Sequence, residues 1–187
     1  MDGPASIEIL SGKAEVFGKP LRETQKIMVR EGKRKPFYAT EPLTLNIQLG
    51  ANAAVQEAEG STIPQSWNKP AQTIQTLKVK PVIAMVMGAS DAGKSSFCTY
   101  LLNKLVQGNH KVGVLDGDLG QSDIGPTATV SYAVSEQPVT ELGNLKMQNG
   151  FFVGVTSPVN SVNKAVQGLC AMMKELQEKQ PDYIIIN

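Results

Sequence analysis

The sequence is poor in residues that mark several classes of protein. It contains two cysteines and one histidine in 187 residues. Cys98 and Cys170 lie within helical patterns with no metal-site spacing around them, so we interpret them as buried, reduced thiols of an intracellular protein. The histidine, His110, follows Gly108-Asn109 in a turn. We therefore expect it to be an exposed loop residue rather than a catalytic base.

Long apolar runs and an excess of charge of one sign are also absent. No apolar run approaches the length of a membrane span, and the start Met1-Asp2-Gly3-Pro4 lacks the basic and apolar regions of a signal peptide. We expect a cytoplasmic protein without a membrane partner. The net charge of +1 gives no global sign of nucleic-acid binding, so any such site must be a local basic patch.

What the first part of the chain does contain is a series of short β-type runs without helical period. The turn-rich stretch of residues 60–70 follows them and is interpreted as a connector, and Ala51–Glu59 is a candidate for one more strand. These features predict a small antiparallel β domain and connector over residues 1–72. The predicted strands are Ser6–Leu10, Ala14–Phe17, Lys26–Val29, Phe37–Thr40 and Leu43–Leu49.

From Val82 onward the pattern alternates between apolar strands and amphipathic helices. Such alternation predicts an α/β domain with a mostly parallel sheet and helices on both faces, over residues 73–187. Because the chain stops directly after an apolar strand of the interior type, we expect it to be truncated. The predicted strands are Val82–Met87 (buried on both faces), Lys111–Leu115, Phe151–Val155 and Tyr183–Ile186, and the predicted helices are Lys94–Gln107 and Ser161–Lys179.

A phosphate-binding motif joins the first of these strands to the first helix. The motif G-x-x-x-x-G-K-[ST] predicts a P-loop NTPase fold whose backbone amides and helix N-terminus hold the phosphates of a nucleotide. Lys94 would reach the β- and γ-phosphates, and the Ser95 hydroxyl would bind Mg²⁺. The predicted nucleotide-binding residues are Gly88, Ala89, Ser90, Asp91, Ala92, Gly93, Lys94, Ser95 and Ser96.

Two further polar segments follow strands at the same predicted edge of the sheet. Asp116 and Asp118 come directly after the second strand, where a carboxylate can hold Mg²⁺ through water or accept a proton from the attacking group. We therefore place Ser95, Asp116 and Asp118 in the predicted metal site. Thr156-Ser157-Pro158 follows the third strand, and is either a γ-phosphate or substrate contact or only the lead-in to the next helix.

Together these motifs resemble the polynucleotide 5′-hydroxyl kinase family, which includes archaeal RNA kinases and eukaryotic kinases of pre-mRNA cleavage factor and ribosome biogenesis. The P-loop, the Asp-x-Asp-x-Gly-Gln turn of residues 116–121, and Gly154-Val155-Thr156-Ser157-Pro158 carry the resemblance. A softer match is the run of residues 12–18. The turn is the most specific of these elements.

The resemblance implies an ATP- and Mg²⁺-dependent phosphotransferase that moves the γ-phosphoryl of ATP to the 5′-hydroxyl of RNA or DNA. It implies that Asp118 acts on the acceptor hydroxyl, that Thr156 lies near the transferred phosphate, and that Gln121 contacts the substrate. Lys94 keeps its contact with the β- and γ-phosphates and counts with Asp118 and Thr156 as a catalytic residue. It also implies an RNA-processing complex as partner.

The family continues into a Thr-x-Gly-Trp segment, a lid with a catalytic arginine, and a C-terminal domain, none of which follows Asn187. We therefore expect this chain to bind nucleotide weakly and to transfer phosphate poorly or not at all.

Three alternatives remain open. A MinD-like ATPase switch has a similar acidic turn, but it typically carries a second lysine where this chain has Ala89. A GTPase would read guanine with an Asn-Lys-x-Asp motif, which these residues lack. A non-catalytic scaffold would keep ATP as a structural element of an RNA-processing complex. Phosphorylation of a 5′-hydroxyl oligonucleotide distinguishes the enzyme from the scaffold, and nucleotide competition distinguishes ATP from GTP.

Overall fold

The computed structural model describes all residues from Met1 to Asn187, and the chain divides into two compact units, Met1–Trp67 and Asn68–Asn187. Helix α1 (Asn68–Thr76) opens the second unit, so the sequence-based boundary between residues 72 and 73 falls inside it. The helix was missed because its sequence is polar and buries only Ala71. None of the helices combines the length and the apolar content needed to cross a membrane.

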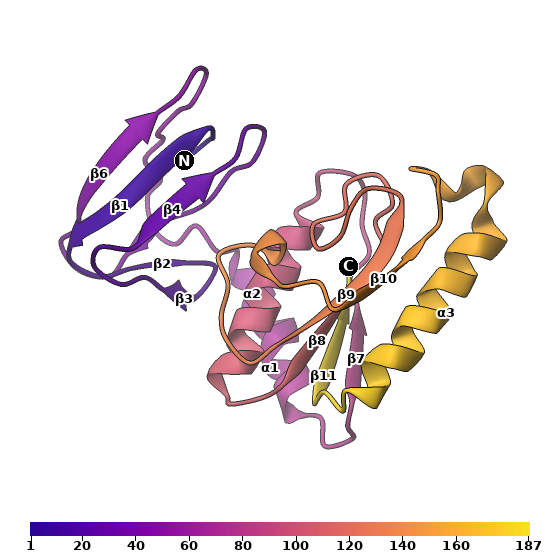
Figure 1. Ribbon diagram of the computed structural model, residues 1–187. Coiled ribbons are helices and arrows are strands. Elements are labelled where there is room, and N and C mark those ends of the chain that lie inside the picture. The colour runs from indigo at the N-terminus through magenta and orange to yellow at the C-terminus, as the bar shows by residue number, and fades with distance from the viewer. The chain divides into compact units, whose positions relative to one another are not determined.

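The first unit consists of two small antiparallel sheets (Figure 1). One has the strand order β4-β1-β6 and the other β3-β2-β5. A 3₁₀ turn, η1 (Gln65–Trp67), ends the unit. The strands are β1 (Ala5–Ser11), β2 (Ala14–Val16), β3 (Lys19–Pro20), β4 (Lys26–Val29), β5 (Tyr38–Ala39) and β6 (Thr44–Leu49).

Alternation along β1 builds the core of this unit. Ala5, Ile7 and Ile9 are buried, and Ile7 pairs with Ile27 on one side and Ile47 on the other. Side chains at every second position of a strand point to the same face, so one face of β1 supplies the core. The antiparallel β domain is thus confirmed. The candidate strand Ala51–Glu59 is wrong: these residues form a turn and one isolated bridge, between Ala54 and Asp2.

The second unit is built around a five-stranded sheet with the order β10-β9-β8-β11-β7 (Figure 1). Strand β11 runs parallel to both β7 and β8, whereas β9 is antiparallel to β8 and to β10. Strand β10 therefore points the same way as the three parallel strands, and their carboxyl ends share one edge. The strands are β7 (Val82–Met85), β8 (Val112–Asp116), β9 (Thr129–Ser135), β10 (Asn149–Phe152) and β11 (Tyr183–Ile186).

Three features of this sheet differ from the sequence prediction. Strand β7 is not buried on both faces, because it is an edge strand: Ile83 is 48% and Met85 61% exposed. Strand β10 is the other edge, ends at Phe152 rather than Val155, and leaves Phe152 68% exposed. Strand β9 was missed, because its alternating Thr, Val and Ser residues give no continuous apolar run although Thr129–Ala133 is buried.

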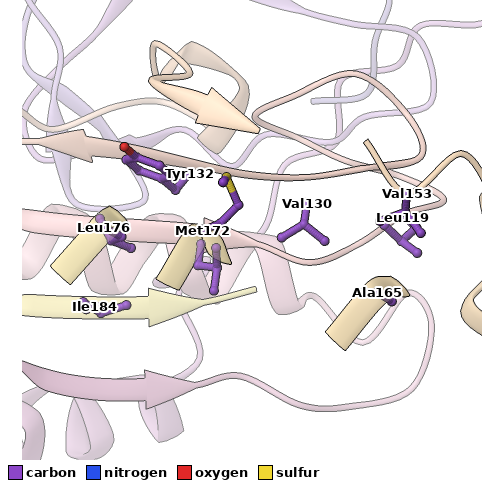
Figure 2. Packing of buried hydrophobic residues seen from close by; sticks show 9 residues of the cluster. Leu119, Val130, Tyr132, Val153, Ala165, Met172, Leu176 and Ile184 are labelled. Atoms are coloured by element: carbon purple, nitrogen blue, oxygen red, sulfur yellow. The ribbon is translucent and has the colours of Figure 1, made fainter. Parts of the chain in front are cut away.

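Helices cover both faces of the sheet, as predicted (Figure 1). Helix α2 (Lys94–Gln107) has the predicted bounds, and α3 (Val162–Glu178) falls one residue short at each end. Ile184 packs with Met172 and Leu176 of α3 (Figure 2). Leu115 belongs to the same buried cluster. Two 3₁₀ turns, η2 (Leu142–Asn144) and η3 (Pro158–Asn160), complete the unit.

Helix α3 lies close to the sheet because β8 carries a glycine beneath it. A Cβ atom at Gly113 would lie 2.6 Å from the Cδ1 atom of Leu176, closer than real side chains approach. Leu176 itself is fully buried. The absence of a side chain at position 113 therefore lets the C-terminal half of the helix sit directly on the strand.

Candidate functional site

The candidate site lies at the carboxyl edge of the second unit's sheet, where four of the five strands end. The phosphate loop follows β7, the acidic turn follows β8, the segment 154–158 follows β10, and Asn187 follows β11. In open α/β sheets this edge is where ligands bind. The topology therefore brings together the three motifs predicted from the sequence, and it adds Asn187.

The phosphate loop is shaped by two residues with left-handed backbone conformation, Asp91 (φ 58°) and Gly93 (φ 83°). Gly93 precedes α2, and its carbonyl accepts the N–H of Phe97 at 2.9 Å as the first bond of the helix. Gly88 does not have a positive φ, so the backbone there does not demand glycine. Residues 88–92 are exposed and residues 93–96 half-buried, so the loop is open to a ligand.

Lys94 and Ser95 lie in the first turn of α2. The Lys94 ammonium group donates to the carbonyl of Ala89 at 2.9 Å, which holds the lysine across its own loop. The first N–H groups of a helix have no partner within the helix, and they carry its positive dipole end. One lysine and a set of backbone donors thus converge on the loop, an arrangement suited to phosphate oxygens.

Asp116 is the centre of the acidic turn, and it is fully buried. Its Oδ2 atom accepts from the Ser122 hydroxyl and the backbone N–H groups of Asp123 and Ile124, at 3.0, 2.7 and 3.0 Å. Its Oδ1 atom accepts from the N–H of Asp118 at 3.2 Å and from the Asn187 amide at 3.4 Å. Desolvation raises the pKa of this carboxyl group above its ordinary value, and the hydrogen bonds oppose that effect. Asp116 therefore organises the turn from inside.

Asp118 differs from Asp116 in being exposed. Its Oδ1 atom accepts the backbone N–H groups of Gly120 and Gln121, both at 2.9 Å, so the carboxylate is fixed in a tight turn. Gln121 is also exposed. Of the two carboxylates, Asp118 is the one that a substrate can reach.

Thr156 lies next to the acidic turn. A Cβ atom on Gly120 would be 3.3 Å from the Thr156 carbonyl oxygen and 3.6 Å from Oδ1 of Asp118. Thr156 is exposed, as are Ser157 and Pro158. The side chain of Ser157 makes no capping hydrogen bond to the 3₁₀ turn η3. The structure thus places the predicted residues Asp118 and Thr156 on neighbouring loops.

The sequence prediction missed Asn187. Its side chain lies between the phosphate loop and the acidic turn, 3.3 Å (Nδ2) from the Ser95 hydroxyl and 3.4 Å (Nδ2) from Oδ1 of Asp116. The buried thiol of Cys98 also contacts it, at 3.5 Å. The available signal was its position directly after the apolar strand Tyr183–Ile186, where parallel strands present polar residues at the functional edge.

The buried thiol of Cys98, which contacts Asn187, is unreactive at neutral pH. Desolvation, followed by the nearby negative charge of Asp116, raises the pKa of Cys98 to about 12. Cys98 therefore stays protonated at neutral pH and can donate to Asn187. Cys170, predicted to be buried, is instead exposed on α3, because it faces away from the sheet. His110 is half-exposed and 3.7 Å from Asp182, at the opposite edge of the sheet.

Comparison with known proteins shows which family the chain belongs to. The family model described as the P-loop of the mRNA cleavage and polyadenylation factor CLP1 matches residues 88–187, which is more than half of the sequence. The chain belongs to this family. The match begins at Gly88 and includes the phosphate loop, the acidic turn, residues 154–158 and Asn187.

Several curated proteins resemble this member of the CLP1 P-loop family. A polyribonucleotide 5′-hydroxyl-kinase of Pyrococcus furiosus is 32% identical over 125 residues, which are 67% of this chain and 35% of the relative. The polyribonucleotide 5′-hydroxyl-kinase Clp1 of Danio rerio is 25% identical over 175 residues, 83% of this chain and 37% of the relative. The chain therefore spans little more than a third of the length of these relatives.

Solved structures of Clp1p share the fold of this CLP1 family member. A complex of wild-type Clp1p with Pcf11p residues 454–563 matches 100% of this chain and 49% of that chain, with a TM-score of 0.72 and 16% sequence identity. The P-loop α/β fold preceded by antiparallel β structure is thereby confirmed.

Proposed function

We propose that this chain is the nucleotide-binding part of an ATP-dependent polynucleotide 5′-hydroxyl kinase, which transfers the γ-phosphoryl of ATP to the 5′-hydroxyl of RNA or DNA. The observation that carries the proposal is the meeting of three groups at one sheet edge: the phosphate loop, the exposed carboxylate of Asp118, and Thr156. The names of the curated relatives support the same activity.

The phosphates would bind to the loop of residues 88–96, where the backbone donors and Lys94 meet their charge. Phosphoryl transfer needs little covalent chemistry from a protein and depends on positioning and charge neutralisation. Lys94, held across the loop by Ala89, can turn from that carbonyl to the β- and γ-phosphates. Thr156 would lie near the transferred phosphate.

Asp118 is the residue that we propose to accept the proton of the 5′-hydroxyl. It is exposed, and its Oδ1 atom is fixed by two backbone donors, which leaves Oδ2 outside these bonds. A positioned carboxylate of this kind typically contributes about 10²- to 10⁴-fold to a proton-transfer step. Gln121, whose backbone N–H anchors the same turn, would contact the acceptor strand.

The residues present fit a magnesium ion bound together with ATP. Ser95 offers a hydroxyl, Asp116 and Asp118 lie in the adjoining turn, and Asp116 is linked to Ser95 through Asn187. Magnesium usually keeps several waters and binds through one or two protein groups plus phosphates. It would neutralise charge on the phosphates. Because both Asp116 oxygens already accept hydrogen bonds, we propose that Asp116 acts on the ion through neighbouring groups or water.

The family description and the complex of Clp1p with Pcf11p support one further proposal, that the protein works within an RNA-processing assembly.

A transfer assay tests the proposed activity. Labelled ATP is incubated with the chain, or with a longer form of the protein, and with RNA and DNA oligonucleotides ending in a 5′-hydroxyl. The same oligonucleotides ending in a 5′-phosphate serve as the matched control. We expect label on the 5′-hydroxyl oligonucleotides alone. Tight binding of ATP without transfer in any form of the protein would favour a scaffold, and competition by GTP alone would favour a GTPase.

A further inference from the structure

Asn187 is fixed at the centre of the site by its backbone. Its N–H donates to the carbonyl of Leu115 at 2.9 Å, and its carbonyl accepts from the N–H of Gly117 at 3.0 Å. These two bonds extend the pairing of β11 with β8 past the end of both strands. The Asn187 side chain is therefore held between the acidic turn and the first turns of α2.

Hydrogen-bond chemistry determines which way its amide points. The Asp116 carboxylate lies 3.4 Å from Nδ2, and an ionised carboxylate only accepts hydrogen bonds. The amide nitrogen must therefore face Asp116. Ser95 Oγ lies almost equally far from both amide atoms, 3.3 Å from Nδ2 and 3.4 Å from Oδ1. With the Nδ2 protons directed to Asp116, the amide oxygen is left to accept from the Ser95 hydroxyl and from the Cys98 thiol at 3.5 Å.

This orientation matters for the role proposed for Ser95. A serine that binds a metal ion does so through an oxygen lone pair, so its hydroxyl proton must point away from the ion and toward an acceptor. The amide oxygen of Asn187 is that acceptor. The Asp116 carboxylate, itself fixed by the backbone of the acidic turn, holds the amide in place from the other side.

We infer that Asn187 is a positioning residue that orients the Ser95 hydroxyl for magnesium and connects it to the buried carboxylate of Asp116. This inference rests on the proposed binding of ATP with magnesium at the phosphate loop. In the proposed arrangement Asn187 acts on the ion through Ser95 and not on the nucleotide itself. Its removal should therefore weaken the magnesium-dependent part of ATP affinity and leave the magnesium-independent part unchanged.

The test is calorimetric titration of ATP into the folded chain, once with magnesium and once with EDTA. The dissociation constant measured with EDTA, divided by the one measured with magnesium, is the magnesium ratio and gives the contribution of magnesium to ATP affinity. Loss of a residue that orients a metal ligand typically costs about 10- to 100-fold in metal affinity. We expect Asn187→Ala to lower the ratio by about tenfold, with the EDTA value within about twofold of wild type. In a Ser95→Ala background, Asn187→Ala should lower it no further, because the two residues act as a unit.

Asn103→Ala is the matched control. Asn103 is another asparagine of the second unit; it is fully buried, whereas Asn187 is half-buried, and it bonds both the N–H and the carbonyl of Val139, at 2.8 and 2.9 Å. Its loss should lower the melting temperature without changing the magnesium ratio. If Asn187→Ala does not fold, Asn187→Ser carries the test, because a serine is too short to bridge Asp116 and Ser95, and the same fall is expected.

An unchanged ratio in a folded Asn187 variant would overturn the inference, as would equal losses with magnesium and with EDTA. An ATP affinity that does not depend on magnesium in the wild-type chain would also overturn it. The proposed kinase activity is decided separately by the transfer assay. ATP binding with normal magnesium dependence but no transfer to any oligonucleotide would reject the kinase and leave the role of Asn187 standing.

Discussion

The phosphate loop and the acidic turn lie at the same sheet edge but are built in opposite ways. Residues 88–92 of the loop are exposed, and its lysine bonds one of its own carbonyls. The acidic turn folds around the fully buried carboxylate of Asp116, which accepts hydrogen bonds from Asp118, Ser122, Asp123, Ile124 and Asn187. The loop leaves its donors open to a ligand, whereas the charge of the turn is already met by neutral hydrogen-bond donors of the chain.

The contrast assigns different work to two carboxylates only two positions apart. Asp116 belongs to the architecture of the turn, and Asp118 is presented by that architecture to solvent. A preorganised support beneath an exposed reactive group is what positioning-based catalysis requires. Substitutions in the loop, in the support and at the exposed carboxylate should therefore affect different measurements.

The largest effect is expected for Asp118→Asn in a form of the protein that shows transfer. The amide keeps an oxygen for the turn but cannot take the proton, so the transfer rate should fall by about 10²- to 10⁴-fold. ATP affinity should stay within about twofold, since Asp118 is not part of the phosphate loop. Single-turnover transfer and calorimetry separate the two quantities. A greater loss of transfer for a folded Asp116→Asn variant would give the proton-accepting role to the other carboxylate.

Asp116→Ala tests whether the buried Asp116 carboxylate holds the acidic turn together. The change leaves several buried donors without an acceptor, each worth about 1–3 kcal/mol, so the free energy of unfolding should fall by about 3 kcal/mol. Asp118→Ala removes an exposed carboxylate two residues away, and it should cost no more than about 1 kcal/mol. Urea denaturation of both variants gives the comparison. Similar losses for the two would mean that Asp116 does not carry the turn.

Lys94→Ala tests the loop. Hydrogen bonds to charged groups are worth about 1.5–3 kcal/mol, so ATP affinity should fall by roughly 10- to 100-fold. The free energy of unfolding should change little, because Lys94 bonds only an exposed carbonyl of its own loop. Calorimetry and urea denaturation on the same preparation check both statements. Unchanged ATP affinity would remove the phosphate-binding role from this lysine.

The smallest effect concerns the two thiols. Cys98 is buried with its pKa raised to about 12, so at pH 8 only on the order of one molecule in 10,000 carries the thiolate. Cys170 is exposed. A thiol reagent at pH 8 should modify Cys170 at least about 100-fold faster than Cys98 in the folded protein, as peptide mass mapping would show. In urea the two should react alike. Fast labelling of Cys98 would show that the hydrogen-bonded groups around Asn187 and Asp116 open readily to solvent.

The sequence predicted the parts of the fold whose patterns are local. The bounds of α2 follow from a phosphate motif before a helical apolar pattern, and β8 and β11 follow from continuous apolar runs. Strand β9 could not be found in this way, because its Thr and Ser residues are buried by pairing with β8 and β10 rather than by their own hydrophobicity. The exposure of β7 likewise depends on strand order, which no single segment encodes.

The candidate site likewise contains residues that local sequence patterns predict and residues whose role depends on the fold. The motif residues Lys94, Ser95 and Asp118 could be predicted because their types and spacing carry the chemistry. The burial of Asp116 and its bonds could not, since three of its donors are backbone groups that any sequence supplies. Asn187 carries no motif within this chain. Its importance emerges only when β11 is placed beside β8.

The close approach of Gly113 and Leu176 couples the position of α3 to the middle of the sheet. A methyl group at position 113 would overlap the Leu176 side chain, so either that side chain or the helix would have to shift. The other end of that rigid rod follows Pro158–Asn160 and, just before them, Thr156. A displacement of the helix would be passed on to the loop beside Asp118, so the missing side chain at position 113 can affect where Thr156 lies.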